Sequence, residues 1–215
     1  MSLAHNGVLF LDELPEFRRS TLETLRQPLE DGTVTISRAA GSMTFPADFV
    51  LVAALNPCPC GYHGDRQKEC RCGFGEVLRY RNRVSGPLLD RIDIQLSVPA
   101  VSWQELSGGQ TGESSEAIRV RVLKARKRQK ERFGNGARCN ARMRSREIRQ
   151  YCEVTSEGSG LLQKAVQTMN LSARAYDRIL KVARTIADLA DEDAILPEHL
   201  QEAIGYRALD REVWK

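Results

Sequence analysis

Two adjacent carboxylates, Asp12 and Glu13, directly follow the apolar run Gly7-Val8-Leu9-Phe10-Leu11. An Asp at the carboxyl end of a buried strand can hold Mg²⁺ through its waters, and a Glu beside it can orient the water that attacks a γ-phosphate. The pattern therefore indicates a Walker B strand. The alternative is a core strand that leads into an acidic helix start, because Asp and Glu are favoured near helix N-termini.

Asn56 ends a second apolar run, residues 49–55. Its side-chain amide can donate a hydrogen bond to a phosphate oxygen or orient a water, which an apolar residue at a strand end cannot do. Asn56 is thus a candidate nucleotide-sensing residue. The alternative is a turn residue that precedes Pro57.

Arg91 comes just before a third predicted strand, residues 92–98. A guanidinium presents a fork of donors that matches phosphate oxygens and stabilises charge that develops during phosphoryl transfer. The alternative role for Arg91 is an ion pair with Asp90 or Asp93.

Residues 32–45 alternate with a period of two on either side of a small-residue turn, which predicts a β-hairpin just before the strand that ends at Asn56. Arg38 lies beside the predicted turn.

Four cysteines form two C-x-C pairs, Cys58 with Cys60 and Cys70 with Cys72. Four thiolates at this spacing could close a tetrahedral, structural Zn²⁺ site, and His63 could replace one of the ligands. The alternative is a polar insertion that carries reduced, partly buried thiols.

Composition limits the class of protein. The chain has 215 residues with 41% hydrophobic content and no long apolar run, which excludes a membrane span and predicts one or two domains with a real core. Six cysteines without an export signal favour metal binding or reduced thiols over disulfides, so we expect a cytoplasmic protein.

A Ser- and Gly-rich stretch near residues 99–115 separates two patterns. Strands alternate with helices before it, and the pattern after it is helical throughout. The sequence therefore predicts an α/β part at 1–100, a linker at 101–115 and an all-helical domain at 116–215. We expect Ser172 to cap one helix of this domain and Pro197 to open the last one.

The first predicted helix after the linker is strongly basic. It contains Arg119, Arg121, Lys124, Arg126, Lys127, Arg128, Lys130 and Arg132. Such a density could contact nucleic-acid phosphates. The alternative is a solvated face, because the aromatic residues that would stack on bases are nearly absent there.

The order of these motifs resembles the Mg-chelatase-like branch of the AAA+ ATPase family, and within it a bacterial competence-associated type. The similarity is carried by Asn-Pro-Cys-Pro-Cys-Gly at 56–61, Ser-Gly-Pro-Leu-Leu-Asp-Arg-Ile-Asp at 85–93 and Leu-Ser-Ala-Arg-Ala-Tyr-Asp-Arg-Ile-Leu at 171–180. It runs over nearly the whole chain. The resemblance implies an α/β fold with a partial AAA+ (P-loop NTPase) core and a C-terminal all-helical lid domain.

The resemblance also implies roles for single residues. Asp12 and Glu13 would serve metal coordination and water activation, Asn56 would be sensor 1, and Arg91 would be an arginine finger supplied to a neighbouring subunit. Arg38 would face DNA in the central pore of a ring.

Arg174 matches the family's sensor-2 arginine, with Arg178 as the weaker candidate. Arg174 would lie in the first turn of the helix capped by Ser172, where the positive end of the helix dipole disfavours a cation unless an anion is near. A bound phosphate would supply that anion.

The sequence contains no Gly-Lys dipeptide, so the phosphate-cradling loop G-x-x-x-x-G-K-[ST] is missing from it. We therefore expect the chain to be the C-terminal part of a longer protein and to be inactive by itself. The missing strand would leave an open apolar slot in the sheet, with rearrangement or self-association there.

For the longer protein, the resemblance implies an ATP-hydrolysing motor that uses ATP and Mg²⁺. We expect a homo-oligomer, a hexamer, that binds DNA and drives branch migration during natural transformation and recombination. The alternative is a metal-chelatase-type motor subunit that remodels a protein partner. The insertion with four cysteines and the segment from Ser172 to Tyr176 favour the first reading.

Overall fold

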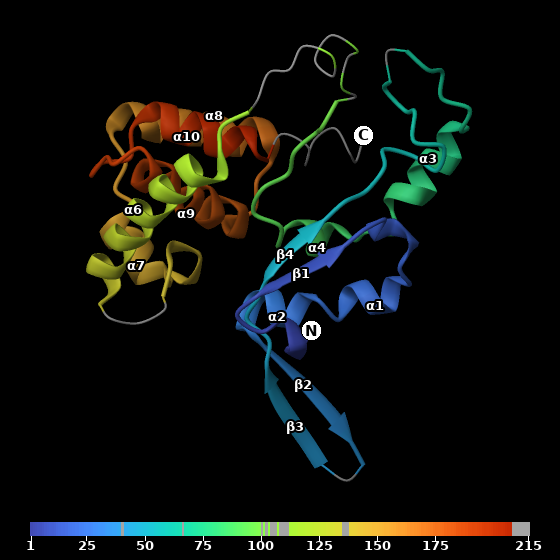
Figure 1. Ribbon diagram of the computed structural model, residues 1–215, viewed down its shortest axis with the longest axis horizontal. Coiled ribbons are helices and arrows are strands. Elements are labelled where there is room, and N and C mark those ends of the chain that lie inside the picture. The colour runs from blue at the N-terminus through green and yellow to red at the C-terminus, as the bar shows by residue number, and fades with distance from the viewer. Residues whose placement is uncertain are drawn as a thin grey trace. The chain divides into compact units, whose positions relative to one another are not determined.

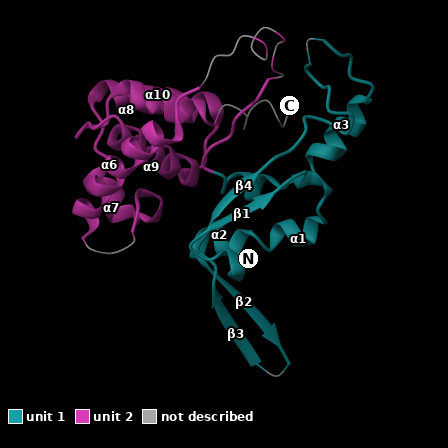
Figure 2. Cartoon of the chain, viewed as in Figure 1, with its two compact units in different colours: residues 1–92, 213–215 teal, residues 93–212 magenta. Residues whose placement is uncertain are grey.

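The computed structural model describes residues 1–39, 41–65, 67–99, 101, 103, 107, 112–134 and 138–207 (Figure 1). These residues fall into two compact units (Figure 2). Unit 1 comprises residues 1–92, and unit 2 comprises the described residues from 93 onward. Each unit is described by itself below.

A two-stranded parallel sheet is the centre of unit 1. It consists of β1 (Val8–Leu11) and β4 (Val50–Ala53), with Val8 opposite Val50 and Leu11 opposite Ala53. Both strands were predicted from their apolar runs, and both are confirmed. Parallel strands need a long crossover connection, and here the connection contains two short helices and a hairpin.

One face of this sheet is packed and the other is exposed. Leu9, Leu11 and Ala53 pack against a buried cluster of five residues contributed by the segments around α1 (Arg19–Glu23), α2 (Arg26–Asp31) and α4 (Gly86–Leu89). That cluster consists of Leu14, Leu22, Leu25, Val84 and Leu88. On the opposite side, Val8, Phe10, Val50 and Val52 are between 43% and 62% exposed, and we call them the uncovered sheet face.

Two short helices, α1 and α2, replace what could have been one longer helix. Pro28 lies inside α2, and α1 ends at Glu23 with Thr24 as its C-cap, four residues before Pro28. A proline has no N–H to donate, and its ring clashes with the carbonyl four residues before it. The break therefore follows from Pro28. Gly32 then ends α2 with φ of 69°, a left-handed conformation that glycine adopts without a steric penalty.

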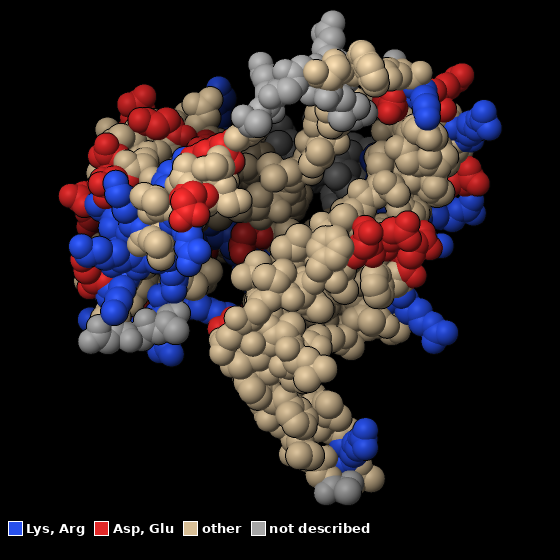
Figure 3. Space-filling model, in the orientation of Figure 1, with Lys and Arg blue, Asp and Glu red and all other residues tan. Residues whose placement is uncertain are grey.

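The predicted hairpin is confirmed as β2 (Thr33–Arg38) paired antiparallel with β3 (Gly41–Pro46). It extends away from the rest of unit 1 (Figure 1). Facing hydroxyls pair across the two strands: Thr35 with Thr44 and Ser37 with Ser42, each at 3.0 Å between oxygens. Arg38 is the only charged residue in either strand, and Figure 3 shows an uncharged shaft with basic atoms near its end.

The predicted third strand at residues 92–98 is wrong. This segment is extended but belongs to no sheet, and its apolar residues Ile94, Leu96 and Val98 are exposed. A strand forms only where a neighbour takes up its backbone hydrogen bonds. Within the described residues no strand lies beside this segment, and the N–H of Gln95 donates to the Tyr206 carbonyl oxygen at 3.0 Å.

Unit 2 is helical. Its helices are α6 (Ser115–Phe133), α7 (Ser145–Tyr151), α8 (Ser156–Met169), α9 (Ala173–Leu189) and α10 (Pro197–Gly205). Helix α9 lies at the centre and packs against α6, α7 and α10. Eleven buried residues form one core, with Ile179, Leu180, Ala183 and Ala187 from α9. The predicted helix starts are confirmed: Ser172 Oγ accepts from the N–H of Ala175 at 3.2 Å, and Pro197 opens α10.

A buried ionic network joins three segments of unit 2. Asp188 on α9 is fully buried and accepts two hydrogen bonds from Arg132 on α6, at 2.7 and 2.8 Å, and one from the side-chain amide of Asn140, at 2.7 Å. Arg184 adds a further contact at 3.1 Å. Burial alone would raise the pKa of Asp188, but these hydrogen bonds and the two guanidinium charges outweigh it and hold the pKa below its usual range.

Among the helices that the structure describes, none combines the length and the apolar character needed to cross a membrane.

Candidate functional site at the strand ends

The carboxyl ends of β1 and β4 bring three predicted site residues to one edge of the sheet. Leu11 and Ala53 are paired at the last position of each strand. The pairing continues because the N–H of Ala54 donates to the Leu11 carbonyl oxygen and the N–H of Leu14 donates to the Ala54 carbonyl oxygen, both at 2.9 Å. Asp12 and Glu13 on one chain segment therefore lie beside the segment that leads to Asn56. At such an edge of a parallel sheet, ligands are commonly bound.

Glu13 has an unusual backbone. Its φ and ψ are 50° and 48°, the left-handed region, which costs a non-glycine residue of order 1–3 kcal/mol. Asp12 stabilises this turn, since its Oδ1 accepts the Glu13 N–H at 2.9 Å. Both residues are exposed, and within the described residues neither forms an ion pair. The turn thus presents two carboxylates whose charge is not neutralised by a side chain.

Tyr80 connects this edge to α3 (Phe74–Arg81) and was not identified from the sequence. Its ring is buried, and its hydroxyl lies close enough to the backbone of Asn56 for that backbone to affect its pKa. Burial raises the pKa of Tyr80, the negative charges of Glu16 and Glu13 raise it further, and the Asn56 backbone acts in the opposite direction. A buried aromatic residue on a helix is an ordinary core feature, so no sequence signal marked Tyr80 as a neighbour of the site.

Two arginines after Tyr80 hold the same region together. Arg81 Nε donates to the Pro57 carbonyl oxygen at 3.0 Å, directly after Asn56. Arg83 donates to the Pro15 carbonyl oxygen at 3.2 Å and to Glu16 at 2.9 Å, two and three residues after Glu13. The carboxylate turn and the Asn56 turn are therefore both attached to the end of α3.

Arg91 is buried and paired within unit 1. It is 8% exposed and forms an ion pair with Glu30 at the end of α2, while its guanidinium also donates to the Pro87 carbonyl oxygen at 2.7 Å. Glu30 was not among the partners considered from the sequence. Asp93, which was, forms an ion pair with Arg178 in unit 2. The arginine-finger role of Arg91 stays a prediction.

Arg174 and Arg178 lie on α9 of unit 2. Arg174 is exposed in the first turn, at the positive end of the helix dipole, as the sequence predicted. Arg178, one turn later, is mostly buried and bound to Asp93. Their sensor-2 role is not tested by this geometry, because it concerns their approach to a nucleotide.

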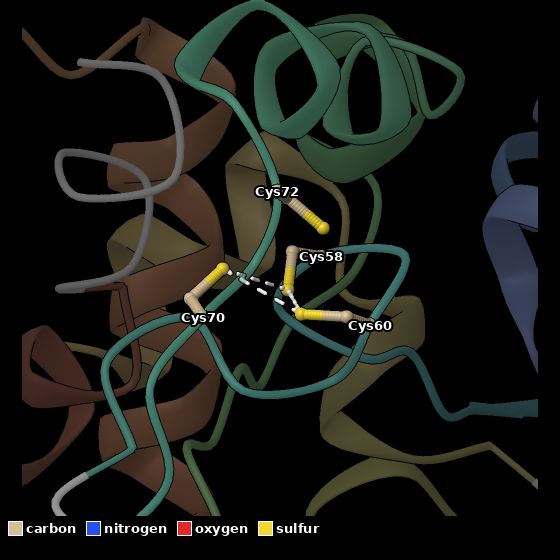
Figure 4. Close-up of side chains that lie close together, drawn as sticks. All are labelled: Cys58, Cys60, Cys70 and Cys72. Carbon is tan, nitrogen blue, oxygen red and sulfur yellow. Dashed lines mark hydrogen bonds between the residues drawn. The ribbon is translucent and has the colours of Figure 1, made fainter.

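The four cysteines of the two C-x-C pairs gather in one cluster (Figure 4). The Sγ atom of Cys58 is 3.4 Å from that of Cys60 and 3.7 Å from that of Cys70, and the last two are 3.6 Å apart. All four sulfurs, Cys72 included, lie within 4.8 Å of one another. His63 is not part of this group.

The thiols of this cluster differ in acidity. Backbone amides of Tyr62 and Arg71 lie close to the Cys60 sulfur and lower its pKa to about 6. The amide of Cys60 lowers the pKa of Cys72, but desolvation and the neighbouring Cys60 and Cys58 sulfurs outweigh it and raise that pKa to about 12. Crowded thiolates repel one another, and a bound cation would offset that repulsion.

Much of the basic helix α6 is engaged within unit 2. Arg121 binds Glu113, Arg128 binds Asp191 and Asp193, and Arg132 binds Asp188. These pairs favour the interpretation of α6 as a structural, partly solvated helix over that of a nucleic-acid surface. Its first half nevertheless exposes the apolar residues Ile118, Val120, Val122 and Leu123.

Comparison with known proteins identifies the family. Residues 1–106 match the family model described as magnesium chelatase, subunit ChlI, and residues 112–207 match the model of the ChlI C-terminal part. The chain therefore belongs to the magnesium-chelatase ChlI-like family. Within that family it is of the ComM/YifB type, which confirms the competence-associated resemblance.

Two of these relatives are equally similar to the chain. The YifB protein of Escherichia coli and the competence protein ComM of Haemophilus influenzae are each 49% identical over 212 residues, which is 98% of this chain and 41% of the relative. An uncharacterized protein of Mycobacterium tuberculosis is 38% identical over 208 residues, 96% of this chain and 41% of the relative. The chain spans about two fifths of the length of these relatives.

Proposed function

We propose that the complete protein containing this chain is an ATP-hydrolysing AAA+ motor of the Mg-chelatase-like family. In this proposal it acts as a hexameric DNA branch-migration helicase in natural transformation and recombination, in the cytoplasm. The observation that carries the proposal is the sheet edge where Asp12, Glu13 and Asn56 meet with both carboxylates exposed. The similarity to a competence protein supports the choice of DNA as the substrate.

The strand-end residues fit a hard divalent cation and a phosphate. Asp12 offers a carboxylate oxygen, the kind of ligand that Mg²⁺ prefers. Glu13 can accept a hydrogen bond from a water and orient it, and the Asn56 side chain can donate to an anionic oxygen. Bound Mg²⁺ would supply charge neutralisation at the phosphates.

The left-handed turn at Glu13 supports this assignment. Backbone strain in a residue of this kind is found preferentially at active sites, where it pre-organises a side chain. Tyr80, Arg81 and Arg83 then hold the two polar turns at fixed positions through contacts with Asn56, Pro57 and Glu16. The chain's own contribution to hydrolysis is thus positioning.

Arg91, Arg174 and Arg178 complete the proposed nucleotide site in an assembled ring. For Arg91 to reach a neighbouring subunit, its ion pair with Glu30 has to open, because the side chain is buried in the present arrangement. For Arg178, the competing partner is Asp93. We propose that nucleotide binding and assembly exchange these carboxylates for phosphate oxygens.

The hairpin is the proposed DNA contact. It projects from unit 1, its shaft carries hydroxyl and apolar side chains, and Arg38 next to the turn is its only charge. A lone cation at the end of a neutral ribbon is suited to touch a phosphate backbone inside a pore without binding it tightly.

The test is ATP hydrolysis by a protein of the relatives' full length that contains this chain, with and without branched DNA. Glu13→Gln should lower the rate of hydrolysis by about 10²–10⁴-fold. Arg38→Ala should keep the basal rate and lose the stimulation by branched DNA, whereas Arg19→Ala, an exposed arginine on α1, should keep both. Hydrolysis by the unsubstituted protein that ignores DNA would instead favour the chelatase-type alternative, a motor that remodels a protein partner.

The 215-residue chain itself should hydrolyse no ATP, because it contains no G-x-x-x-x-G-K-[ST] sequence. Hydrolysis by the isolated chain that disappears in Glu13→Gln would contradict this part of the proposal.

A further inference from the structure

The cluster of Cys58, Cys60, Cys70 and Cys72 has the dimensions of a metal site. Four sulfurs at about 2.3 Å from a tetrahedral zinc ion are about 3.8 Å from one another. The separations of 3.4, 3.6 and 3.7 Å among Cys58, Cys60 and Cys70 approach that value, and Cys72 completes the group (Figure 4). They are also far longer than the 2.05 Å of a disulfide, and all four cysteines are free.

Backbone amides surround the sulfurs of the cluster, as they commonly do around thiolate ligands of a metal ion. The backbone amides of Tyr62 and Arg71 lie close enough to the Cys60 sulfur to lower its pKa, and the amides of Cys60 and Cys72 act in the same way on Cys72 and Cys70. Such donors orient thiolate ligands and offset their negative charge. Gly61 and Gly64, both with φ of 83°, make the tight turns that bring the two pairs together.

We propose that these four cysteines bind one structural Zn²⁺ ion, which closes the loop between Asn56 and α3. An all-thiolate tetrahedral set selects zinc or iron, and a site with four protein ligands leaves no position for a substrate. An iron–sulfur cluster would distribute its thiolates over several iron atoms and would hold them farther apart than this compact group. The inference does not depend on the proposed function, because a chain that bound no nucleotide would still bind the metal.

The position of the loop determines which part of the chain the zinc ion would stabilise. The chain leaves the sheet edge at Asn56, passes through the cluster and returns as α3, whose Tyr80 contacts the backbone of Asn56. Arg81 contacts Pro57 in the same way. A metal ion that binds both C-x-C pairs therefore holds the two ends of this loop in place, including the turn that carries Asn56. Removal of the ion should loosen that turn first.

The first test is the metal content of the chain, purified without chelators and measured by mass spectrometry. We expect about one zinc per chain, and tetrahedral thiolate charge-transfer and ligand-field absorption when Co²⁺ replaces it. Cys72→Ser should lose the zinc, and Cys139→Ser, which removes a cysteine of unit 2 outside the cluster, should keep it. A metal-free chain, iron in place of zinc, or zinc retained in Cys72→Ser would each overturn the proposal.

A second test avoids substitution, in case Cys72→Ser fails to fold. A chelator applied to the unsubstituted chain should release the zinc, make four further thiols reactive toward a disulfide reagent, and be reversed by added Zn²⁺. Hydrogen exchange should rise in peptides covering Asn56 and α3 and stay unchanged in α9. Unchanged exchange around Asn56 after zinc release would overturn the structural role.

Discussion

Units 1 and 2 differ in how completely each buries its own apolar surface. Unit 2 has one continuous core of eleven buried residues, and its central acid, Asp188, is surrounded by arginines and an amide. Unit 1 has a five-residue cluster under one face of a two-stranded sheet, and the other face is exposed. Parallel sheets are normally covered on both faces.

This difference coincides with a division of roles. The residues proposed for chemistry, Asp12, Glu13 and Asn56, lie in the sparsely packed unit, at an edge held by hydrogen bonds and, we propose, by a metal ion. Unit 2 supplies a rigid body around α9. Substitutions of these exposed strand-end residues should therefore alter activity with little loss of stability, and substitutions in the buried ionic network of unit 2 should do the reverse.

The largest expected effect is on activity, in unit 1. In the full-length protein, Glu13→Gln should lower the rate of ATP hydrolysis by about 10²–10⁴-fold, the usual contribution of a positioned acid–base group. The thermal midpoint should hardly move, because Glu13 is exposed and within the described residues makes no ion pair. Steady-state hydrolysis and thermal unfolding measure the two quantities.

The matched control for this change is Asp31→Asn, an exposed carboxylate at the end of α2. Its hydrolysis rate should equal that of the unsubstituted protein. Equal rates for Glu13→Gln and Asp31→Asn would remove Glu13 from the mechanism.

The largest expected effect on stability is in unit 2. Asp188→Asn leaves Arg132 and Arg184 near each other without their shared carboxylate, so unfolding of unit 2 should become easier by about 3–5 kcal/mol. Asp191→Asn, which removes an exposed partner of Arg128, should cost about 0–1 kcal/mol. Urea unfolding of the 215-residue chain, followed by far-UV circular dichroism, compares them, and equal midpoints would contradict the assigned role of Asp188.

A low pH should lower the unfolding free energy of unit 2 in the same way, without a substitution. Because the folded-state pKa of Asp188 is lowered, its contribution is present above the unfolded-state pKa of about 3.9 and disappears as the pH falls through the folded-state value. The unfolding free energy of unit 2 should therefore decrease below about pH 4, and Asp188→Asn should lack this part of the decrease.

A smaller effect tests how tightly the core of unit 2 is packed. A Cβ atom at Gly158 on α8 would lie 2.7 Å from Cδ1 of the fully buried Leu200, so Gly158→Ala should cost about 1–3 kcal/mol. Gly160→Ala, on the same helix with open space around it, should instead stabilise by about 0.5–1 kcal/mol. Opposite shifts in thermal midpoint are expected, and a stabilised Gly158→Ala would show that the core is loose.

The smallest effect concerns the uncovered sheet face. In the 215-residue chain, Phe10→Ala should change stability by no more than about 0.5 kcal/mol, as at other exposed positions, whereas Leu22→Ala on the packed side should cost about 2–5 kcal/mol. Repeating Phe10→Ala in the full-length protein sharpens the comparison. A larger loss there would mean that the face is covered in the longer chain.

The sequence predicted those elements whose signals are local. The apolar runs identified β1 and β4, alternation identified the hairpin, and Ser172 and Pro197 marked the starts of α9 and α10. Residues 92–98 carry the same kind of signal but form no strand. The sequence pattern shows that a segment can form a strand, but the strand forms only where a neighbouring strand pairs with it.

The candidate site was predictable to a similar extent. The sequence placed Asp12, Glu13 and Asn56 at strand ends, which the structure brings to one edge, and the spacing of the cysteines anticipated their cluster. Tyr80 and the Glu30 partner of Arg91 were missed, because both contacts join segments far apart in the sequence. Side chains that position a site from a distance leave no motif.

The single charge of the hairpin, Arg38, limits how strongly its proposed affinity for DNA can depend on salt concentration. Each phosphate that a protein neutralises contributes about −0.9 to the slope of log affinity against log salt on duplex DNA, and about −0.7 on single strands. In the proposed DNA complex, the single cation of the hairpin therefore allows no more than one such increment from this element. A steeper salt dependence would have to come from counterions released at another surface of the protein.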